Sequence, residues 1–313
     1  MSERPQLERL CVHETVDEKI PIEAFADAFS DLDVPVEIVG DDEEFDQTDA
    51  VASFRPREAF LDAGWTHCIR AGYDEFDTDA HEAAGVPLTN STGIHDTTVG
   101  ELAVGYMVSL ARMLHIYRDH QNANDWLADP EYERPFTVEN ERLCVVGLGP
   151  LGQGIAKRAD ALGMDVVGVD IRPVSGLGLD RVYDAARIQQ AVEDARFVVL
   201  TTPLTEATRG LVDRDVFDAM RDDAYLINVS RGAIVDQDAL VEALENDDIA
   251  GAALDVFYDE PLPADAPFWE MEEVIVTPHA AAQAATYGDR IADLLETNLS
   301  RLGDGGTLWN RIV

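Results

Sequence analysis

The stretch Leu143-Cys144-Val145-Val146-Gly147-Leu148-Gly149-Pro150-Leu151-Gly152-Gln153-Gly154 decides the fold class of this chain. A short apolar run meets a Gly-x-Gly-x-x-Gly turn, and a segment compatible with a helix follows at once. A second apolar run, Asp165-Val166-Val167-Gly168-Val169-Asp170, ends in an acid about 20 residues beyond the turn. This order of strand, glycine turn, helix and strand with a terminal acid is typical of a dinucleotide site.

Each glycine of the turn has a separate physical task. Gly147 allows the tight turn, Gly149 lets the backbone approach a pyrophosphate, and Gly152 lets the helix pack closely on the strand. The helix that begins at Pro150 and Leu151 offers unpaired N–H groups and a partial positive charge to the phosphates. The alternative is an ordinary glycine-rich turn of an α/β protein, and the surrounding strands and acid favour the dinucleotide site.

The composition indicates a globular protein of two domains. At 313 residues the chain is long for a single core, and its 46% hydrophobic residues contain no low-complexity tract. No apolar run approaches the ~20 residues that cross a bilayer. The polar start Met1-Ser2-Glu3-Arg4 is unlike a signal peptide, so we expect a cytoplasmic protein. The scattered Cys11, Cys68 and Cys144 favour buried thiols over a disulfide framework or a metal cluster.

The charge balance is strongly acidic. The chain has 62 Asp and Glu against 23 Lys and Arg, a formal net charge of −39, and its only lysines are Lys19 and Lys157. Such a surface repels itself at low salt, whereas molar salt shortens the screening length to about 3 Å. We therefore expect a protein from the salt-rich cytoplasm of a halophile; an acidic protein from an ordinary cytoplasm is the alternative. The negative surface also argues against nucleic acid or an anionic membrane as a partner.

The first hundred residues have the pattern of a small α/β unit. Apolar runs predict strands at 7–12, 36–39, 50–54 and 65–69, with a helix over 21–29. The last strand leads into Arg70-Ala71-Gly72-Tyr73-Asp74-Glu75-Phe76-Asp77. This loop lies at the carboxyl end of a strand, where open α/β sheets bind their ligands.

A long helix is predicted near 98–120. Thr98-Val99-Gly100-Glu101 matches a capping box, and apolar residues then recur at helical spacing. They are Val99, Leu102, Ala103, Tyr106, Met107, Leu110, Leu114 and Tyr117. This face should either cover the core of the chain or form the interface of a homodimer.

After Asp170, strands and helices continue to alternate. Short apolar runs, typical of a parallel sheet that is buried on both faces, lie at 197–200, 225–229, 251–254 and 274–276. Each run is followed by polar residues, and the carboxyl ends of parallel strands share one edge of a sheet. These polar residues include Thr201-Thr202-Pro203, Ser230-Arg231-Gly232, Asp255 and Thr277-Pro278-His279. The sequence therefore predicts an active-site rim beside the glycine turn.

Four motifs in this order resemble the D-2-hydroxyacid dehydrogenase family over roughly residues 50 to 300. They are the glycine turn, Asn228-Val229-Ser230-Arg231-Gly232-Ala233-Ile234-Val235-Asp236, Leu254-Asp255-Val256-Phe257-Tyr258-Asp259-Glu260-Pro261-Leu262 and Thr277-Pro278-His279. The resemblance implies two Rossmann-like, doubly wound parallel-sheet domains with the active site in the cleft between them. It implies a substrate domain of residues 1–95 and 285–313 and a dinucleotide-binding domain of residues 96–284.

The resemblance also assigns catalytic and substrate-binding residues. His279 corresponds to the general acid and base, which suits an imidazole that titrates near neutral pH. Glu260 corresponds to its carboxylate partner, and Arg231 to the guanidinium that holds the substrate's carboxylate and carbonyl. The N–H groups of Ala71 and Gly72 correspond to a second carboxylate clamp. Taken singly, such a histidine, arginine or glutamate is more often structural or solvated, but their joint occurrence in this order favours catalysis.

The cofactor implied is NAD or NADP, with dual use open. Asp170 should bind the adenine ribose hydroxyls of NAD, whereas Arg172 could accept the 2′-phosphate of NADP. Asp255 is expected to orient the nicotinamide amide. Ala281 departs from the family, which commonly has glycine there, and could narrow the nicotinamide pocket. The cofactor-binding set is Gly147, Gly149, Pro150, Leu151, Gly152, Asp170, Arg172, Thr202, Pro203, Thr208, Val229, Ser230, Asp255, His279 and Ala281.

The expected reaction is the reduction of 2-keto acids to D-2-hydroxy acids and its reverse. A phosphoglycerate dehydrogenase or a glyoxylate/hydroxypyruvate reductase remains open. Glu260 argues against a formate dehydrogenase, because formate dehydrogenases of this fold have glutamine at that position. Phosphite dehydrogenases use a lysine of the substrate domain, and the lack of lysine between Lys19 and Lys157 argues against that function. A binding role like that of NADH-sensing transcriptional corepressors is the alternative from another class. Substrate choice is open, although Phe54, Arg55 and Tyr73 could border the side-chain pocket. No metal is expected.

Overall fold

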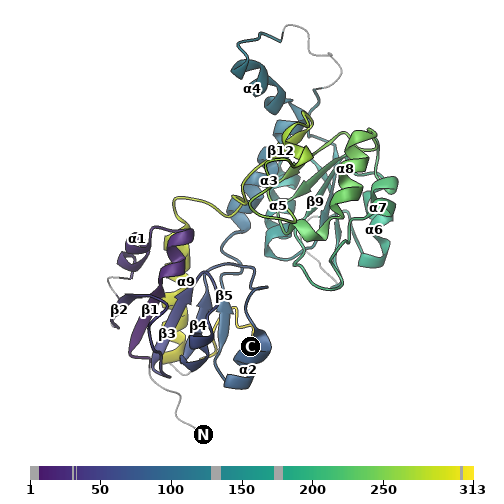
Figure 1. The fold of residues 1–313 in the computed structure, drawn as a ribbon. Helices are drawn as coiled ribbons and strands as arrows, with labels where there is room; N and C mark the ends of the chain where they lie inside the picture. The colour runs from purple at the N-terminus through teal and green to yellow at the C-terminus, as the bar shows by residue number, and fades with distance from the viewer. Residues whose placement is uncertain (1–6, 30–31, 33, 128–134, 173–178, 304–305) are drawn as a thin grey trace. The chain divides into compact units, whose positions relative to one another are not determined.

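The computed structural model describes residues 7–29, 32, 34–127, 135–172, 179–303 and 306–313. The chain divides into two compact units. The discontinuous unit comprises Met1–His95 and Gln283–Val313, and the central unit comprises Asp96–Ala282. Figure 1 shows the helices and strands of each unit, which are described in turn.

The described residues of the discontinuous unit form a five-stranded parallel sheet in the order β2-β1-β3-β4-β5. The strands are β1 (Arg9–His13), β2 (Val36–Val39), β3 (Asp49–Ser53), β4 (Trp65–Cys68) and β5 (Leu88–Asn90). The helices are α1 (Ile22–Asp27), α2 (Thr78–Ala84) and α9 (Tyr287–Gly303), with 3₁₀ turns η1 (Glu14–Glu18) and η2 (Glu58–Asp62). The first four strands and α1 confirm the predicted elements. No apolar run predicted β5, which is only three residues long.

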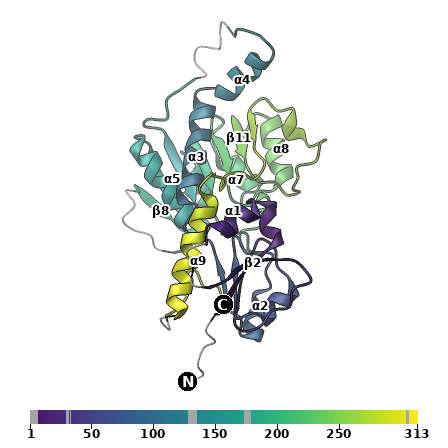
Figure 2. The same ribbon diagram turned by 90° about the vertical axis from the view of Figure 1, so that its left-hand side faces the viewer.

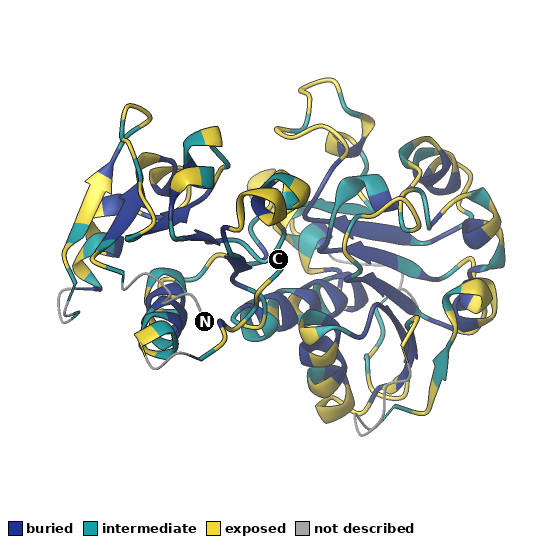
Figure 3. Cartoon of the chain, turned by 90° about the horizontal axis from the view of Figure 1, so that it is seen from below, coloured by how far each residue is buried: buried dark blue, intermediate teal, exposed yellow. Residues whose placement is uncertain are grey.

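Both faces of the inner strands of this sheet are buried, whereas the edge strand β2 is partly exposed. Leu10 and Val12 of β1 pack into a cluster with Phe25 of α1 and Leu295 of α9, whereas Cys11 packs against Phe60 on the other face. Figure 3 shows the buried strands in dark blue beneath helices whose outer faces are exposed. Because neighbouring residues of a strand point to opposite faces, burial on both sides requires a continuous apolar run rather than alternation.

The described residues of the central unit form a seven-stranded parallel sheet in the order β12-β11-β10-β9-β6-β7-β8. The strands are β6 (Arg142–Val146), β7 (Asp165–Val169), β8 (Arg181–Tyr183), β9 (Phe197–Leu200), β10 (Tyr225–Asn228), β11 (Gly251–Leu254) and β12 (Val274–Val276). The helices are α3 (Asp96–Ala111), α4 (Leu114–Asn122), α5 (Pro150–Ala161), α6 (Ile188–Val192), α7 (Arg214–Ala219) and α8 (Gln237–Glu245). Short 3₁₀ turns are η3 (Ala185–Arg187), η4 (Gly232–Ile234) and η5 (Pro267–Trp269).

The strand order reverses between β6 and β9. From β6 the chain builds outward through β7 to β8, and from β9 it builds in the other direction to β12. Ligands of such sheets bind at the carboxyl ends of the strands beside this switch point. The glycine turn directly follows β6, so it lies at the switch point.

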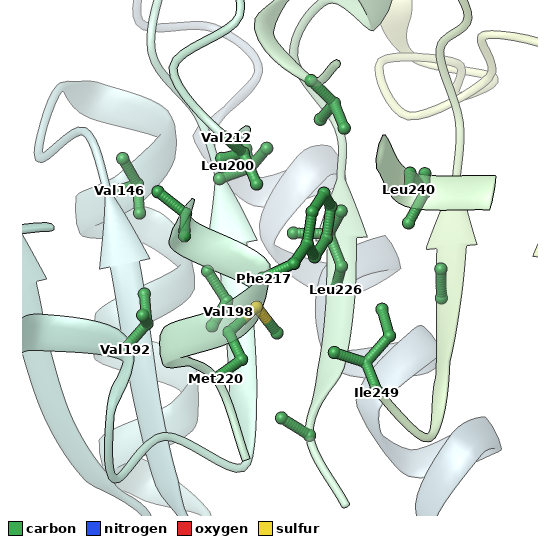
Figure 4. Close-up of a cluster of buried hydrophobic side chains, with 14 of the residues drawn as sticks. Val146, Val192, Val198, Leu200, Val212, Phe217, Met220, Leu226, Leu240 and Ile249 are labelled. Atoms are coloured by element: carbon green, nitrogen blue, oxygen red, sulfur yellow. The ribbon is translucent and has the colours of Figure 1, made fainter. Parts of the chain in front are cut away.

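The two faces of this sheet carry different helices. α3 and α5 pack on one face, where Leu143 and Val145 of β6 are buried. α6, α7 and α8 pack on the other face against Val146 and Leu200. Figure 4 shows this second cluster, in which the ring of Phe217 lies between the strands and α7. All predicted strands of this half are confirmed, whereas the three-residue β8 was not predicted.

The prediction of a single long helix near 98–120 is wrong in two respects. The helix begins at Asp96 rather than at the capping box of Thr98, and it ends at Ala111. Met113 then adopts a left-handed backbone conformation with φ of 55°, and α4 leaves at an angle of 73° to α3. Figure 2, like Figure 1, shows α4 extending away from the body of the central unit. Apolar spacing alone did not predict this break, because Met113 and Leu114 continue the hydrophobic pattern.

The apolar face of α3 packs within its own unit. Tyr106, Met107 and Leu110 are buried in the cluster beside β6 and α5. α3 approaches α5 closely at Gly154, where a side chain would not fit. A Cβ on Gly154 would lie 2.3 Å from the Asp96 carbonyl oxygen. Within the described ranges, no single helix is both long and apolar enough to span a membrane; α3 and α4 reach that length and composition only together, across their bend.

Candidate active site

The glycine turn has the geometry of a dinucleotide-binding loop. Gly147 has a φ of 96°, and its carbonyl oxygen accepts a 2.6 Å hydrogen bond from Thr201 Oγ1. A Cβ on Gly152 would lie 1.9 Å from that same oxygen, whereas a Cβ on Gly149 would meet nothing within 4 Å. α5 starts at Pro150 without a side-chain cap on its N-terminus. The turn therefore leaves open space and uncapped helix N–H groups where a pyrophosphate would bind, which fits the predicted cofactor.

Asp170, at the end of β7, is linked to the glycine turn. Its Oδ2 accepts a 2.8 Å hydrogen bond from the Leu148 N–H, and its Oδ1 accepts from the backbone N–H and the Nε of Arg172 at 2.8 and 3.1 Å. Burial by itself would raise the pKa of Asp170, but the hydrogen bonds from Arg172 and Leu148 outweigh it and lower the pKa. Asp170 is therefore an ionised acceptor that carries its own counterion, and the exposed side chain of Arg172 lies beside it.

The ends of β9 and β10 form the next part of the rim. Ser230 Oγ donates a hydrogen bond to the Thr202 carbonyl oxygen. Thr208 Oγ1 donates to the carbonyl oxygen of Pro203 at 2.6 Å, which stabilises the turn after Thr202. Val229 is buried. The hydroxyl of Thr202 is also buried, and among the described residues it has no hydrogen-bond partner.

Arg231 is positioned by a turn built around Asn228. The side-chain amide of Asn228 donates to the Arg231 carbonyl oxygen at 3.0 Å, and its oxygen accepts from the Ser230 N–H at 3.1 Å. A Cβ on Gly232 would lie 1.9 Å from the carbonyl carbon of Phe257, so this turn touches the loop after β11 through backbone atoms. Sequence reasoning gave Asn228 and Gly232 no role, although an asparagine at a strand end and a glycine beside the key arginine are recognisable signals.

His279 and Glu260 form a hydrogen-bonded pair. His279 Nδ1 lies 2.8 Å from Glu260 Oε2, and the other carboxylate oxygen accepts a 3.0 Å hydrogen bond from the Phe257 N–H. Burial raises the pKa of Glu260, but the hydrogen bonds from His279 and Phe257 outweigh it and lower the pKa, and the charge of Arg231 acts in the same direction. The structure thus brings all three predicted catalytic side chains into one electrostatically coupled cluster.

Asp255 lies inside the protein rather than on the rim. Its side chain is 0% exposed. Its carboxylate accepts hydrogen bonds from Thr277 Oγ1 at 2.5 Å and from the N–H groups of Ala280 and Ala281 at 2.8 and 2.9 Å. Ala281 is itself buried. These contacts connect Asp255 to the loop that carries His279, and sequence reasoning missed this connection.

The predicted carboxylate clamp lies in the discontinuous unit, directly after β4. The Ala71 carbonyl oxygen accepts a 2.5 Å hydrogen bond from the Asn90 side chain, and the Gly72 carbonyl oxygen accepts from Cys68 Sγ at 3.6 Å. The N–H groups of Ala71 and Gly72 donate to no group in the described part of the chain. Two backbone donors without partners at the carboxyl edge of a parallel sheet suit an anionic ligand.

The described residues contain no group of three or more His, Cys, Asp or Glu arranged to hold a metal ion.

Comparison with known proteins agrees with this geometry. Residues 104–281, more than half of the chain, match the family model described as D-isomer specific 2-hydroxyacid dehydrogenase, NAD binding domain. A glyoxylate reductase of Korarchaeum cryptofilum is 31% identical over 230 residues, which cover 73% of this chain and 69% of that protein. The chain belongs to the D-isomer specific 2-hydroxyacid dehydrogenase family. It is therefore an NAD(P)-dependent oxidoreductase of the α/β class.

Two further relatives show the range of this dehydrogenase family. A D-3-phosphoglycerate dehydrogenase of Methanocaldococcus jannaschii is 34% identical over 67% of this chain, but the match covers only 40% of that longer protein. A D-isomer specific 2-hydroxyacid dehydrogenase of Xanthobacter autotrophicus, solved with NADPH and MES, has a TM-score of 0.82 at 26% identity and covers 98% of both chains. The overall resemblance thus extends over nearly the whole dehydrogenase chain.

The glycine turn gives a test of where the cofactor binds. We expect Gly149→Ala to melt like the wild type, because its Cβ meets nothing, yet to bind NADH and NADPH at least about tenfold more weakly. Gly152→Ala should lower both stability and binding, because its Cβ overlaps the Gly147 carbonyl. Thermal melts and fluorescence titrations measure both properties. Unchanged binding of NADH and NADPH by Gly149→Ala would show that the pyrophosphate binds elsewhere.

Proposed function

We propose that this dehydrogenase reduces short 2-keto acids to D-2-hydroxy acids and catalyses the reverse reaction. The observation that supports the proposal is the pair of His279 and Glu260, which lies beside Arg231 on the same sheet edge as the dinucleotide turn. Reduction of a keto acid needs a hydride at carbon, a proton at oxygen and a cation for the carboxylate. Bound NAD(P)H supplies the hydride, and these three side chains supply the other needs.

His279 is the proposed proton donor. Its Nδ1 is bonded to Glu260, so Nε2 is the nitrogen that gives a proton to the substrate's carbonyl oxygen. The hydrogen bond to Glu260 fixes the orientation of the imidazole ring. In the oxidative direction the neutral imidazole removes the hydroxyl proton at the same nitrogen.

The substrate's carboxylate is the proposed ligand of Arg231, and the family resemblance implies a further carboxylate clamp at the N–H groups of Ala71 and Gly72 in the discontinuous unit. A guanidinium binds a planar carboxylate through two parallel hydrogen bonds, which a lysine ammonium cannot do. Asn228 holds the Arg231 turn by its side chain. The two clamp amides have no described acceptor within the protein, so a substrate carboxylate would satisfy both.

Within the discontinuous unit, the cations around Phe54 are proposed to influence the choice of substrate. Three cations surround this ring, with Lys19 Nζ at 5.6 Å and the guanidinium carbons of Arg55 and Arg70 at 5.3 and 4.6 Å from its centre. In a chain with a net charge of −39 this is an unusual concentration of positive groups, although Glu18 and Glu75 pair with the two arginines. Turnover should therefore be measured with glyoxylate and hydroxypyruvate and with keto acids that carry or lack a second acidic group.

Turnover measurements test the function. We expect the wild type to oxidise NADH or NADPH with at least one 2-keto acid, and His279→Ala to lower kcat by about 10²–10⁴ because the proton donor is lost. Arg231→Ala should lower kcat/KM by a similar factor, and Arg231→Lys should restore little of it. His120→Ala, a partly exposed histidine on α4, is the matched control. A fully active His279→Ala would refute the assigned acid; a wild type that binds NADH but reduces no keto acid would favour a corepressor-like binding role.

The preference between NAD and NADP is proposed to depend on Arg172. Asp170 is ionised and paired with this arginine, so the site holds both a ribose acceptor and a phosphate-binding cation. Arg172→Ala should reduce kcat/KM with NADPH about tenfold more than with NADH, because only NADPH carries the 2′-phosphate. Steady-state kinetics with both cofactors measure the ratio. Equal losses would reject the phosphate role.

We also propose that the protein works at high salt and forms homodimers. Some of its arginines face several acids, as Arg9 does with Glu37, Glu43 and Asp49, and the chain still has a net charge of −39. The dimer interface is proposed to include Leu114 and Trp126, which are 49% and 90% exposed, rather than the face of α3, which is already buried. We further propose that its substrates are small molecules and that it is located in the cytoplasm.

A salt series tests both ideas. The melting temperature should rise between 0.1 and about 3 M KCl, because molar salt screens the repulsion between carboxylates. Sedimentation velocity over the same series should show a dimer that Trp126→Asp converts to a monomer, whereas Trp269→Asp, another exposed tryptophan, should not. Equal stability at low and high salt would refute the halophilic proposal. A monomeric wild type at every salt concentration would refute the dimer.

A further inference from the structure

The backbone of His279 is held in an unusual conformation. Its φ is 52°, in the left-handed region that residues other than glycine seldom adopt. Such a conformation persists only where the surroundings fix it. The sequence around it, Thr277-Pro278-His279-Ala280-Ala281, contains no glycine that would favour it. The constraint therefore has to come from hydrogen bonds to this segment.

Those hydrogen bonds come from Asp255. The Asp255 main-chain oxygen accepts from the His279 N–H at 2.8 Å, and its carboxylate accepts from the Ala280 and Ala281 N–H groups at 2.8 and 2.9 Å. One residue thus binds three consecutive N–H groups. Because the Asp255 side chain is completely buried, it cannot exchange these donors for water.

A second line of hydrogen bonds orients the carboxylate itself. Thr277 Oγ1 donates to Asp255 Oδ1 at 2.5 Å. A threonine hydroxyl has one proton, and Thr277 donates it to Asp255, so Thr277 must accept in its other contact. That contact is the hydroxyl of Tyr106, 2.5 Å away, which is therefore the donor. Burial raises the pKa of Tyr106, so its hydroxyl stays protonated.

We propose that Tyr106, on α3, is a positioning residue that acts through Thr277 and Asp255 to hold His279 in its active conformation. This inference rests on the proposed role of His279. Tyr106 is buried in the helix layer and is remote in sequence from every motif of the site. Its hydroxyl fixes the Thr277 rotamer, Thr277 fixes the carboxylate of Asp255, and Asp255 fixes the backbone on either side of the histidine. No substrate or cofactor contact of Tyr106 is required.

Tyr106→Phe keeps the ring and removes one hydrogen bond. We expect kcat to fall about 3- to 10-fold with little change in the KM of the keto acid, because the loss of one buried hydrogen bond is modest. Thr277→Val should lower kcat further, whereas Thr277→Ser, which keeps the hydroxyl, should retain most of it. Tyr225→Phe is the matched control, since it removes the hydroxyl of a partly buried tyrosine at the amino end of β10. Thermal melts exclude unfolding as the cause.

A double variant separates positioning from general stabilisation. If Tyr106 acts only through Thr277, Tyr106→Phe combined with Thr277→Val should have the kcat of Thr277→Val alone. Losses that multiply, or a Tyr106→Phe variant with wild-type kcat, would overturn the proposal. A Tyr225→Phe variant as slow as Tyr106→Phe would overturn it as well.

Hydrogen exchange gives a readout that does not depend on turnover. The amides of Ala280 and Ala281 should exchange faster in Tyr106→Phe and Thr277→Val than in the wild type. In Tyr225→Phe they should exchange at the wild-type rate. Unaltered exchange in both of the first two variants would overturn the relay even if activity fell. A wild type that reduces no keto acid but shows this exchange pattern would instead refute the proposed function and leave the relay as an anchor of the loop.

Discussion

The parallel arrangement of strands in the central sheet is the constraint on which the site depends. Because β6, β9, β10, β11 and β12 run in the same direction, their carboxyl ends share one edge. The strands are short and buried on both faces, so the polar residues that follow them cannot enter the sheet. They are left on the edge, beside the glycine turn that follows β6. Segments far apart in the sequence become neighbours for this reason alone.

Hydrogen bonds then connect each strand end to the next. Thr201 binds the Gly147 carbonyl, and Ser230 binds the carbonyl of Thr202. Gly232 lets the Arg231 turn touch the backbone at Phe257, whose N–H fixes Glu260. Glu260 binds His279, and Asp255 holds the backbone around this histidine. The rim is thus a continuous series of contacts from the glycine turn to His279.

The distribution of charge separates the site from the rest of the surface. Most described carboxylates are exposed, and some arginines are shared among several acids, as Arg214 is between Asp218 and Asp248. At the site the carboxylates have specific tasks instead: Asp170 is linked to the glycine turn, Glu260 orients the histidine, and Asp255 accepts backbone N–H groups. Burial of Asp255 is tolerated because every oxygen has a donor. An acidic protein can therefore keep carboxylates at its centre without large repulsion.

The sequence by itself determined the fold class, the glycine turn and every strand except β5 and β8, and it predicted Arg231, Glu260 and His279 as the catalytic residues. These features depend on local apolar patterns and on spaced motifs, which can be recognised along one dimension. The tertiary structure alone decided that α3 and α4 part at Met113, that β5 and β8 exist, and that Asp255 is buried beneath His279. The physical reason is that short strands gain their stability from neighbouring strands rather than from their own pattern. In the same way, the partner of a buried carboxylate, Tyr106 through Thr277, comes from a distant helix.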